Sequence, residues 1–483
     1  MRHPTLAALG CFVAFGLLLA PGHNSFETPA PESLVALGKT GHLGLPDNPG
    51  GVYVLGTDGR AYSTHEPGAY AVGIPAVAVA RALSRVARLP LEKAIPLVLS
   101  LLCVPLFAAG LLAALGFVRA AAGEGADLSR GALWAVLSTP MLLYGLYPSD
   151  VSLSALVLLG LLPLTFLHGE RRWAPLAWGA ALGFAVLLKV SNATLGLAAG
   201  VALLLRPGVD ARRKFGDIAL LGAGALPSLV ALLAWNALRT GHPLHFPYPE
   251  DHAFALDRLP EGLVGTFASP GRGLLLFAPV LPVLAAGLRW SRVSPQVRAL
   301  LAVLAGSFAL TVLRLAGTPA WTGSGGWAIR YYVPWLGPLA VVLYVAWHQS
   351  GRRWARAVAV ASALGLLVNG AGLLTNYHYR QGLCGMEPWP PRSALSCAVS
   401  ALPANVARTL GAPVPEVVLE GASPANVFAS NRLATWWMAA RAYGVPPAAS
   451  FAVGALLLAC GLWLARRAFG SGADRSQARR QPS

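Results

Sequence analysis

The sequence predicts an all-α fold, a polytopic transmembrane helical bundle of about twelve helices with outer-face loops and an interfacial amphipathic helix. Apolar residues make up 55% of the 483, charged residues make up 12%, and the mean hydropathy is +0.57. A soluble chain needs more charge to cover its surface, so the bilayer is the expected solvent for most side chains. Apolar runs of near-spanning length also recur along the chain, and basic residues gather in the connectors between them.

The apolar runs define the predicted crossings, since a helix needs about 20 apolar residues to span a bilayer. They occupy residues 5–20, 94–118, 131–147, 151–167, 173–188, 192–205, 218–235, 274–288, 299–313, 331–347, 357–374 and 449–464. The first run could be a cleaved signal peptide. Pro21 stands where the mature chain would begin, however, and this favours an uncleaved first helix.

The positions of Lys and Arg predict the orientation of these helices. With the N-terminus inside, the inward connectors carry the basic clusters at 171–172, 206–214, 289–298 and 352–356, and the basic tail from 466. Basic connectors stay on the cytoplasmic side, so both termini are expected to be cytoplasmic. The net charge of +17 is spread through these connectors without a concentrated basic domain, which argues against nucleic acid as a partner.

One apolar segment does not fit the alternation. Residues 70–89 carry Arg81, Arg85 and Arg88 at helical spacing on one face, and counting them as a crossing would place every basic cluster outside. An amphipathic helix lying in the interface fits better. The outer face then collects residues 21–93, 239–272, 314–327 and 376–447.

The chain divides accordingly into three predicted regions. Residues 1–374 form a transmembrane core that includes the first outer loop (21–93), residues 375–447 form an outer loop region, and residues 448–483 hold the last helix and a basic inner tail. Two of the five cysteines, Cys384 and Cys397, fall together in the outer loop region. In an oxidising exterior they could form a disulfide, and the alternative is two free thiols.

Three outward carboxylates are candidates for chemistry because they lie at the membrane boundary. Glu27 follows the first helix, Glu66 precedes the interfacial helix, and Asp150 lies at the outer turn between the third and fourth helices. An ionisable group held there is costly unless it is used or paired. Alternatively each is an interfacial charge, and Asp150 could simply cap the fourth helix.

Three outward cations complement these acids. Arg330 lies where a Gly-rich turn meets the start of a helix, and an Arg fork can bind a phosphate through two hydrogen bonds. Arg272 and Lys189 occupy equivalent outer helix ends, where the alternative is snorkelling to lipid headgroups. Zinc-ligand spacings, phosphate loops, nucleophile elbows and dinucleotide fingerprints are absent from the sequence.

The arrangement resembles the C-type membrane glycosyltransferases (GT-C), including the protein O-mannosyltransferases, the aminoarabinose transferases and uncharacterised bacterial relatives. Segment 26–43 resembles their acidic loop after the first helix, although Phe26 stands at the first position of the family's acidic pair. Segments 59–68, 269–279 and 325–334 resemble family loops and helix starts, and Asp150 matches the acid at the outer turn between the third and fourth helices.

The resemblance implies a location in a bacterial inner (plasma) membrane. It also implies a sugar transferred on the outer face from a polyprenyl-phosphate donor to an envelope lipid, glycan or protein. Membrane lipid and an envelope acceptor would be the partners, and a divalent metal ion is used by some family members. The implied catalytic residues are Glu27 and Asp150. The implied substrate-binding residues are Arg330, Arg272, Lys189, Glu66 and Tyr331.

Two other classes of function remain open from the sequence. A polytopic transporter or flippase for an envelope precursor would have the same hydropathy, although charged residues at mid-helix are lacking, which weighs against ion coupling. A catalytically inactive relative is the second alternative, because Phe26 replaces the first acid.

Overall fold

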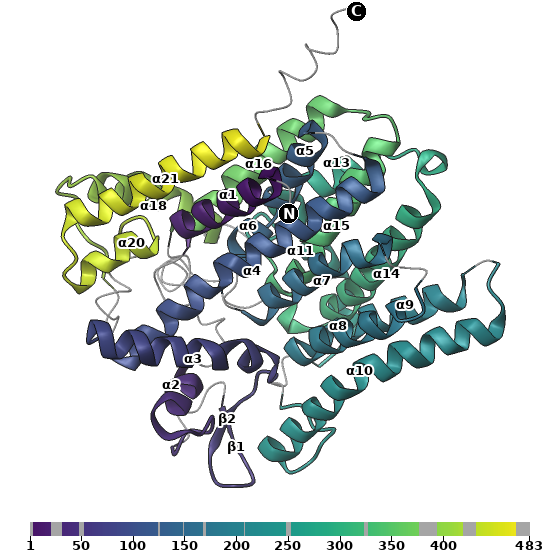
Figure 1. Cartoon of the computed structure of the whole chain (residues 1–483), viewed down its shortest axis with the longest axis horizontal. Coiled ribbons are helices and arrows are strands. Elements are labelled where there is room, and N and C mark those ends of the chain that lie inside the picture. Colours follow the sequence, from purple (N-terminus) through teal and green to yellow (C-terminus); the bar gives the residue numbers. More distant parts are fainter. Residues whose placement is uncertain are drawn as a thin grey trace, which may run out of the picture.

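The computed structural model describes residues 3–20, 31–47, 53–123, 126–147, 149–167, 171–206, 208–247, 253–322, 327–375, 394–418 and 431–469. These residues form a helical bundle with one two-stranded hairpin, which confirms the predicted all-α fold class (Figure 1). Helices dominate because a backbone in lipid must satisfy its own hydrogen bonds.

The N-terminal half begins with α1 (His3–Leu19), α2 (Pro31–Thr40), β1 (Tyr53–Leu55), β2 (Ala61–Ser63) and α3 (Gly68–Ala87). The strands pair antiparallel, with Val54 opposite Tyr62. The bundle continues with α4 (Leu91–Ala122), α5 (Ala126–Leu137), α6 (Met141–Tyr144), α7 (Asp150–Leu167), α8 (Ala174–Leu188), η1 (Val190–Asn192), α9 (Ala193–Leu204) and α10 (Ala211–Thr240).

The C-terminal half holds the remaining helices. They are η3 (Leu256–Arg258), α11 (Leu259–Ala268), α12 (Leu274–Phe277), α13 (Val280–Ala286), η4 (Trp290–Arg292), α14 (Pro295–Ala316), η5 (Pro319–Thr322), η6 (Arg330–Tyr332), α15 (Val333–Gln349), α16 (Ala355–Leu374), α18 (Ala394–Thr409), α20 (Trp436–Ala439), η7 (Ala440–Tyr443) and α21 (Pro447–Phe469). Helix α15 is the centre of the bundle, since nearly all of its side chains are buried.

Among the described residues, six helices are long and apolar enough to cross a membrane: α3, α4, α10, α14, α16 and α21. Shorter apolar helices include α1, α7, α8 and the η1–α9 pair. Helix α3 meets the same criterion of length and composition, so its predicted place along the interface stays a prediction. Arg81 on this helix donates to the carbonyl oxygens of Leu37 and Gly38, so α3 packs against the C-terminal end of α2.

Two predicted single helices are broken. The run 131–147 is divided into α5 and α6 at Pro140, which lacks the N–H that a continuous helix needs. The hydroxyls of Ser138 and Thr139 donate to the carbonyl oxygens of Ala135 and Val136 at this break. The run 274–288 is divided in the same way into α12 and α13, before Pro279.

Small residues let α8 and α10 pack closely side by side (Figure 1). A Cβ added at Gly179 would lie 1.9 Å from the carbonyl oxygen of Leu221, and one at Gly183 would lie 2.7 Å from Cα of Ala225. This Gly-x-x-x-Gly spacing is typical of membrane helix pairs, which associate through close backbone packing. It sets α8 and α10 parallel, and α10 continues beyond the end of α8 to Thr240.

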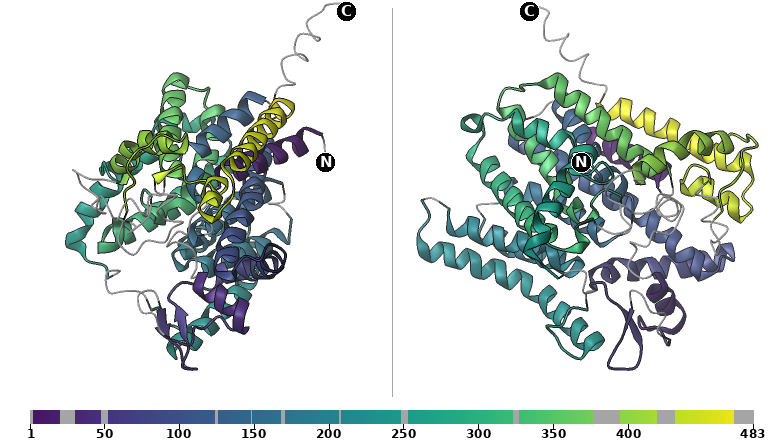
Figure 2. Two further views of the ribbon diagram at one scale, coloured as in Figure 1. Left: turned by 90° about the vertical axis from the view of Figure 1, so that its left-hand side faces the viewer. Right: turned by 180° about the vertical axis from the view of Figure 1, so that it is seen from behind.

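The two ends of the chain's described part meet. Helix α21 packs along α1 (Figure 2). The side chain of Leu464 lies against Gly10, and that of Phe15 lies against Gly461. The C-terminal end of α21 lies at one end of the molecule, and α2, β1 and β2 lie at the other (Figure 1). The orientation of the termini in a membrane stays a prediction, as do the boundaries of the three regions. Cys397 in α18 is disulfide-bonded, and Cys384 lies outside the described residues, so their pairing also stays a prediction.

Candidate active site

The structure brings together charged side chains from four separate segments, at one end of the bundle. Asp150 begins α7 and Lys189 follows the end of α8; Glu66 lies in the loop between β2 and α3. Nζ of Lys189 lies 2.7 Å from Oδ2 of Asp150, with both side chains largely buried. The fourth segment is η6, which carries Arg330 and Tyr331.

Local sequence sets the position of Asp150. Ser149 caps α7, because its Oγ accepts a hydrogen bond from the backbone N–H of Ser152 at 3.2 Å. Ser149 thereby takes the capping role that the sequence left open for Asp150, whose Oδ2 receives the bond from Lys189. Being in the first turn, Asp150 also lies at the positive end of the helix dipole, which favours its anionic form.

Glu66 ties its loop to the turn that carries Lys189. Its side chain is 1% exposed, and Oε1 accepts a hydrogen bond from the backbone N–H of Val190 at 3.1 Å. Burial disfavours the charge on Lys189, but the carboxylates of Asp150 and Glu66 outweigh this effect and raise the pKa of its ammonium group. Lys189 is therefore held as a cation between two acids.

Two cations lie against the ring of Tyr331. Its ring centroid lies 5.0 Å from Nζ of Lys189 and 5.2 Å from Cζ of Arg330. Both distances are within the range of cation–π attraction. The guanidinium of Arg330 also interacts electrostatically with the carboxylate of Asp150. The cluster therefore joins acids and cations in a small, partly dehydrated volume, where electrostatic interactions are stronger than in water.

The segment before Arg330 is held by buried hydrogen bonds. The carbonyl oxygen of Trp327 accepts a bond from the Tyr144 hydroxyl at 3.0 Å, and Trp327 Nε1 donates to Oδ1 of Asn369 at 3.3 Å. Ala328 has φ +54°, a left-handed conformation that costs a non-glycine residue about 1 kcal/mol or more. The anchored Trp327 keeps this turn in place and so determines where Arg330 begins its helix.

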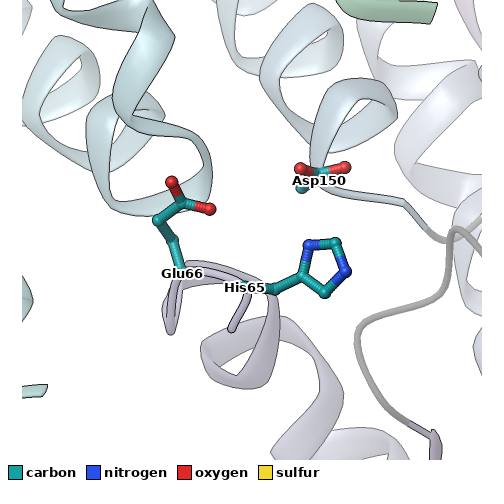
Figure 3. A group of neighbouring side chains, drawn as sticks. All are labelled: His65, Glu66 and Asp150. Atoms are coloured by element: carbon teal, nitrogen blue, oxygen red, sulfur yellow. The ribbon is translucent and has the colours of Figure 1, made fainter. Parts of the chain in front are cut away.

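His65 is a site residue that the sequence did not single out. Its imidazole points toward the carboxylate of Asp150, on the side away from Glu66 (Figure 3). Burial lowers the pKa of this imidazole, against the opposing effect of Asp150, so the neutral ring is favoured. Its place directly before Glu66 was the available signal, but a single histidine in a loop is weak evidence.

His65, Glu66 and Asp150 form a possible cation site. One ligand atom from each lies within 4.8 Å of the other two. Imidazole nitrogen and carboxylate oxygen are ligands that Zn²⁺ accepts, so the donor set fits a divalent ion. Lys189 already occupies Oδ2 of Asp150, and its positive charge opposes a second cation there.

Arg272 and Glu27 are the other two predicted site residues. Arg272 is 1% exposed, and its Nη1 donates to the carbonyl oxygen of Thr322 at 2.8 Å, so it supports the η5 turn. Glu27 lies outside the described residues. The structure thus brings together Asp150, Lys189, Glu66, Arg330 and Tyr331, and their roles in binding and catalysis stay predictions.

Comparisons with known proteins add little. No family model matches this sequence, and no curated protein is similar to it. Among solved structures, the crystal structure of ArnT from Cupriavidus metallidurans bound to undecaprenyl phosphate is similar over 99% of this chain and 80% of that chain. The two are 16% identical, with a TM-score of 0.49. A similarity of this size assigns no activity to the chain.

Proposed function

We propose that this protein is an integral membrane glycosyltransferase that moves a sugar from a polyprenyl-phosphate donor to an envelope lipid, glycan or protein. The observation that carries the proposal is the buried Asp150–Lys189 pair beside Arg330 and Tyr331. A carboxylate beside two cations supplies both requirements of the reaction, a base for the acceptor and positive charge for the leaving phosphate.

Lys189 and Arg330 would hold the donor phosphate. Nζ of Lys189 and Cζ of Arg330 lie 5.0 and 5.2 Å from the centroid of the Tyr331 ring, and an ammonium group and a guanidinium fork both bind phosphate oxygens. When the bond between the sugar C1 and the phosphate oxygen breaks, the electron pair stays on the phosphate. The two cations stabilise that added charge.

Asp150 would act as the base. Glycosyl transfer passes through an oxocarbenium-like state, in which the acceptor oxygen approaches C1 as the phosphate departs. The acceptor hydroxyl then loses its proton, and a carboxylate can take it. Lys189 bonds to Asp150 in the described state, and a bound phosphate would draw the ammonium group away and leave the carboxylate available. Glu27 is a second proposed acid, from its place in the sequence after the first helix and from the family resemblance.

An apolar groove beside the cluster suits a lipid-linked donor. It has a volume of about 450 Å³, and its lining includes Pro67, Tyr70, Leu187 and Trp235. Pro67 follows Glu66 directly, and Leu187 precedes Lys189 by two residues, so the groove adjoins the charged site. A prenyl chain would bury its apolar surface there while its phosphate faced the cations.

The proposed location is the inner membrane of a bacterium, with the site on its outer face.

The proposed sugar transfer is tested with purified protein in liposomes that contain a polyprenyl-phosphate sugar, and transfer is followed by mass spectrometry. Asp150→Asn should abolish transfer. Asp127→Asn is the matched control, because Asp127 is an exposed acid paired with Arg130 in α5, and it should keep wild-type transfer.

A second measurement compares lipid-linked sugars in cells with and without the gene. A polyprenyl-phosphate sugar should accumulate when the gene is deleted. Movement of the donor across the liposome membrane without turnover would instead indicate a flippase. Normal transfer by Asp150→Asn would contradict the assignment of Asp150 as the base.

A further inference from the structure

The side chain of Arg239 is fully buried at the C-terminal end of α10. Its Nη1 donates to three successive carbonyl oxygens, those of Ser63, Thr64 and His65, at 3.1, 2.6 and 2.9 Å. These three residues lead directly into Glu66. One guanidinium from a distant helix therefore holds the backbone of the loop that carries two side chains of the candidate site.

Asn236 orients this guanidinium. Its Oδ1 accepts bonds from Nε and Nη2 of Arg239 at 3.1 and 2.8 Å, while its Nδ2 donates to the carbonyl oxygen of Pro243 at 3.1 Å. The hydroxyl of Thr240 donates to the carbonyl oxygen of Asn236 at 2.8 Å. Arg239 is thus fixed on both sides, toward its own helix and toward the loop.

The same device occurs a second time in the chain. Both α10 and α18 end in Asn-x-x-Arg-Thr, and Nη1 of Arg408 donates to Oδ1 of Asn405 at 3.3 Å. Arg408 is 7% exposed and also donates to the carbonyl oxygens of Val414 at 3.1 Å, Asn431 at 3.1 Å and Pro415. The hydroxyl of the following threonine donates to the asparagine carbonyl oxygen here as well.

The Asn236–Arg239 pair of α10 and the Asn405–Arg408 pair of α18, each called a clamp below, hold different segments. The clamp of α10 holds the loop whose Glu66 accepts the backbone N–H of Val190, next to Lys189. The hydrogen bonds of Arg408 named above go to residues 405, 414, 415 and 431, which belong to a different part of the described chain. Arg408 is therefore a matched control with the same chemistry.

We propose that Arg239 is a positioning residue for the candidate site. It acts through the backbone of residues 63–65, and by placing Glu66 it also places the turn of Lys189. The idea that this affects donor binding rests on the proposed function; the idea that Arg239 orders the loop does not. A guanidinium suits this role because it presents several donors in a rigid plane, which a lysine cannot reproduce.

The test compares Arg239→Met with Arg408→Met in the full-length protein in detergent. Hydrogen–deuterium exchange of residues 61–68 should rise by about tenfold or more in Arg239→Met and stay within about twofold of wild type in Arg408→Met. Affinity for decaprenyl phosphate, used as the probe, should fall by about tenfold in Arg239→Met only. Arg239→Lys should keep part of the protection from exchange and part of the affinity for decaprenyl phosphate, because an ammonium group can still donate to some of the carbonyl oxygens.

The outcomes separate the two ideas. If exchange of residues 61–68 stays at the wild-type rate in both Arg239 variants, the positioning role is wrong. It is also wrong if exchange rises equally in residues 61–68 and in α18, because that indicates general destabilisation. If Arg239→Met does not fold, Arg239→Lys decides by the same measurements. If wild-type protein does not bind decaprenyl phosphate, the proposed function fails, and the exchange data still decide the role of Arg239.

Discussion

Nζ of Lys189 lies 2.7 Å from Oδ2 of Asp150, and the two side chains are 12% and 11% exposed. This pair joins the end of α8 to the start of α7 and forms the centre of the candidate site. A buried pair repays the cost of removing both charges from water only through close contact, so the loss of one partner leaves an uncompensated charge.

Lys189→Met and Asp150→Asn are each expected to lower the free energy of unfolding by roughly 3–5 kcal/mol. The double variant should lose less than the sum, because neither charge is then left alone. Unfolding by SDS in mixed micelles measures this. Lys39→Met is the control, since its ion pair with Glu92 is exposed, and it should cost less than about 1 kcal/mol. Additive single effects would show that the pair does not interact.

Gly68→Ala should separate the loop of Glu66 from the turn of Lys189. An added Cβ would lie 2.6 Å from the backbone of Leu187 and Leu188, which cannot move aside as a side chain does. Overpacking of this kind costs about 1–3 kcal/mol, and affinity for decaprenyl phosphate should fall with it. Gly196→Ala in α9 is the control, because nothing lies within 4 Å of its added Cβ. Equal behaviour of the two variants would contradict the importance of this contact.

His65 predicts a pH dependence of stability. Its pKa is lowered from 6.5 in the folded protein by burial, so the unfolded chain binds the proton more readily. Its contribution to stability is fully present above about 6.5 and is lost as the pH falls toward the folded pKa. The thermal midpoint of wild type should therefore drop between pH 7.5 and pH 5.5 by more than that of His65→Asn. Replacement of the exposed His42 by Asn should keep the wild-type drop.

Lys189→Met is also expected to strengthen the binding of Zn²⁺ to His65, Glu66 and Asp150. The substitution removes a positive charge and frees Oδ2 of Asp150, so affinity should rise by about tenfold or more. Isothermal titration measures it. Adding His65→Gln should reverse the gain by removing one ligand. Unchanged affinity in Lys189→Met would indicate that these three side chains do not form a metal site.

Much of the candidate site could be proposed from the sequence because polar side chains at helix ends stand out in an apolar chain. Asp150, Lys189 and Arg330 were recognisable in this way. His65 and Arg239 were not, because a loop histidine and an arginine at the end of a helix have many ordinary roles. His65 and Asp150 are 85 residues apart in the sequence. Arg239 is 174 to 176 residues from the three residues whose carbonyl oxygens it binds.

The sequence by itself determined that this is a chain of apolar helices, since hydropathy and the placement of Lys and Arg are local properties that the bilayer reads segment by segment. Tertiary structure decided which helix ends meet. The Gly179–Gly183 packing of α8 on α10, the Arg239 clamp and the contact at Gly68 depend on close backbone approach between distant segments. No local pattern encodes such approaches, so the contact between Asp150 and Lys189, and the approach of His65 and Glu66 to Asp150, became visible only in the folded chain.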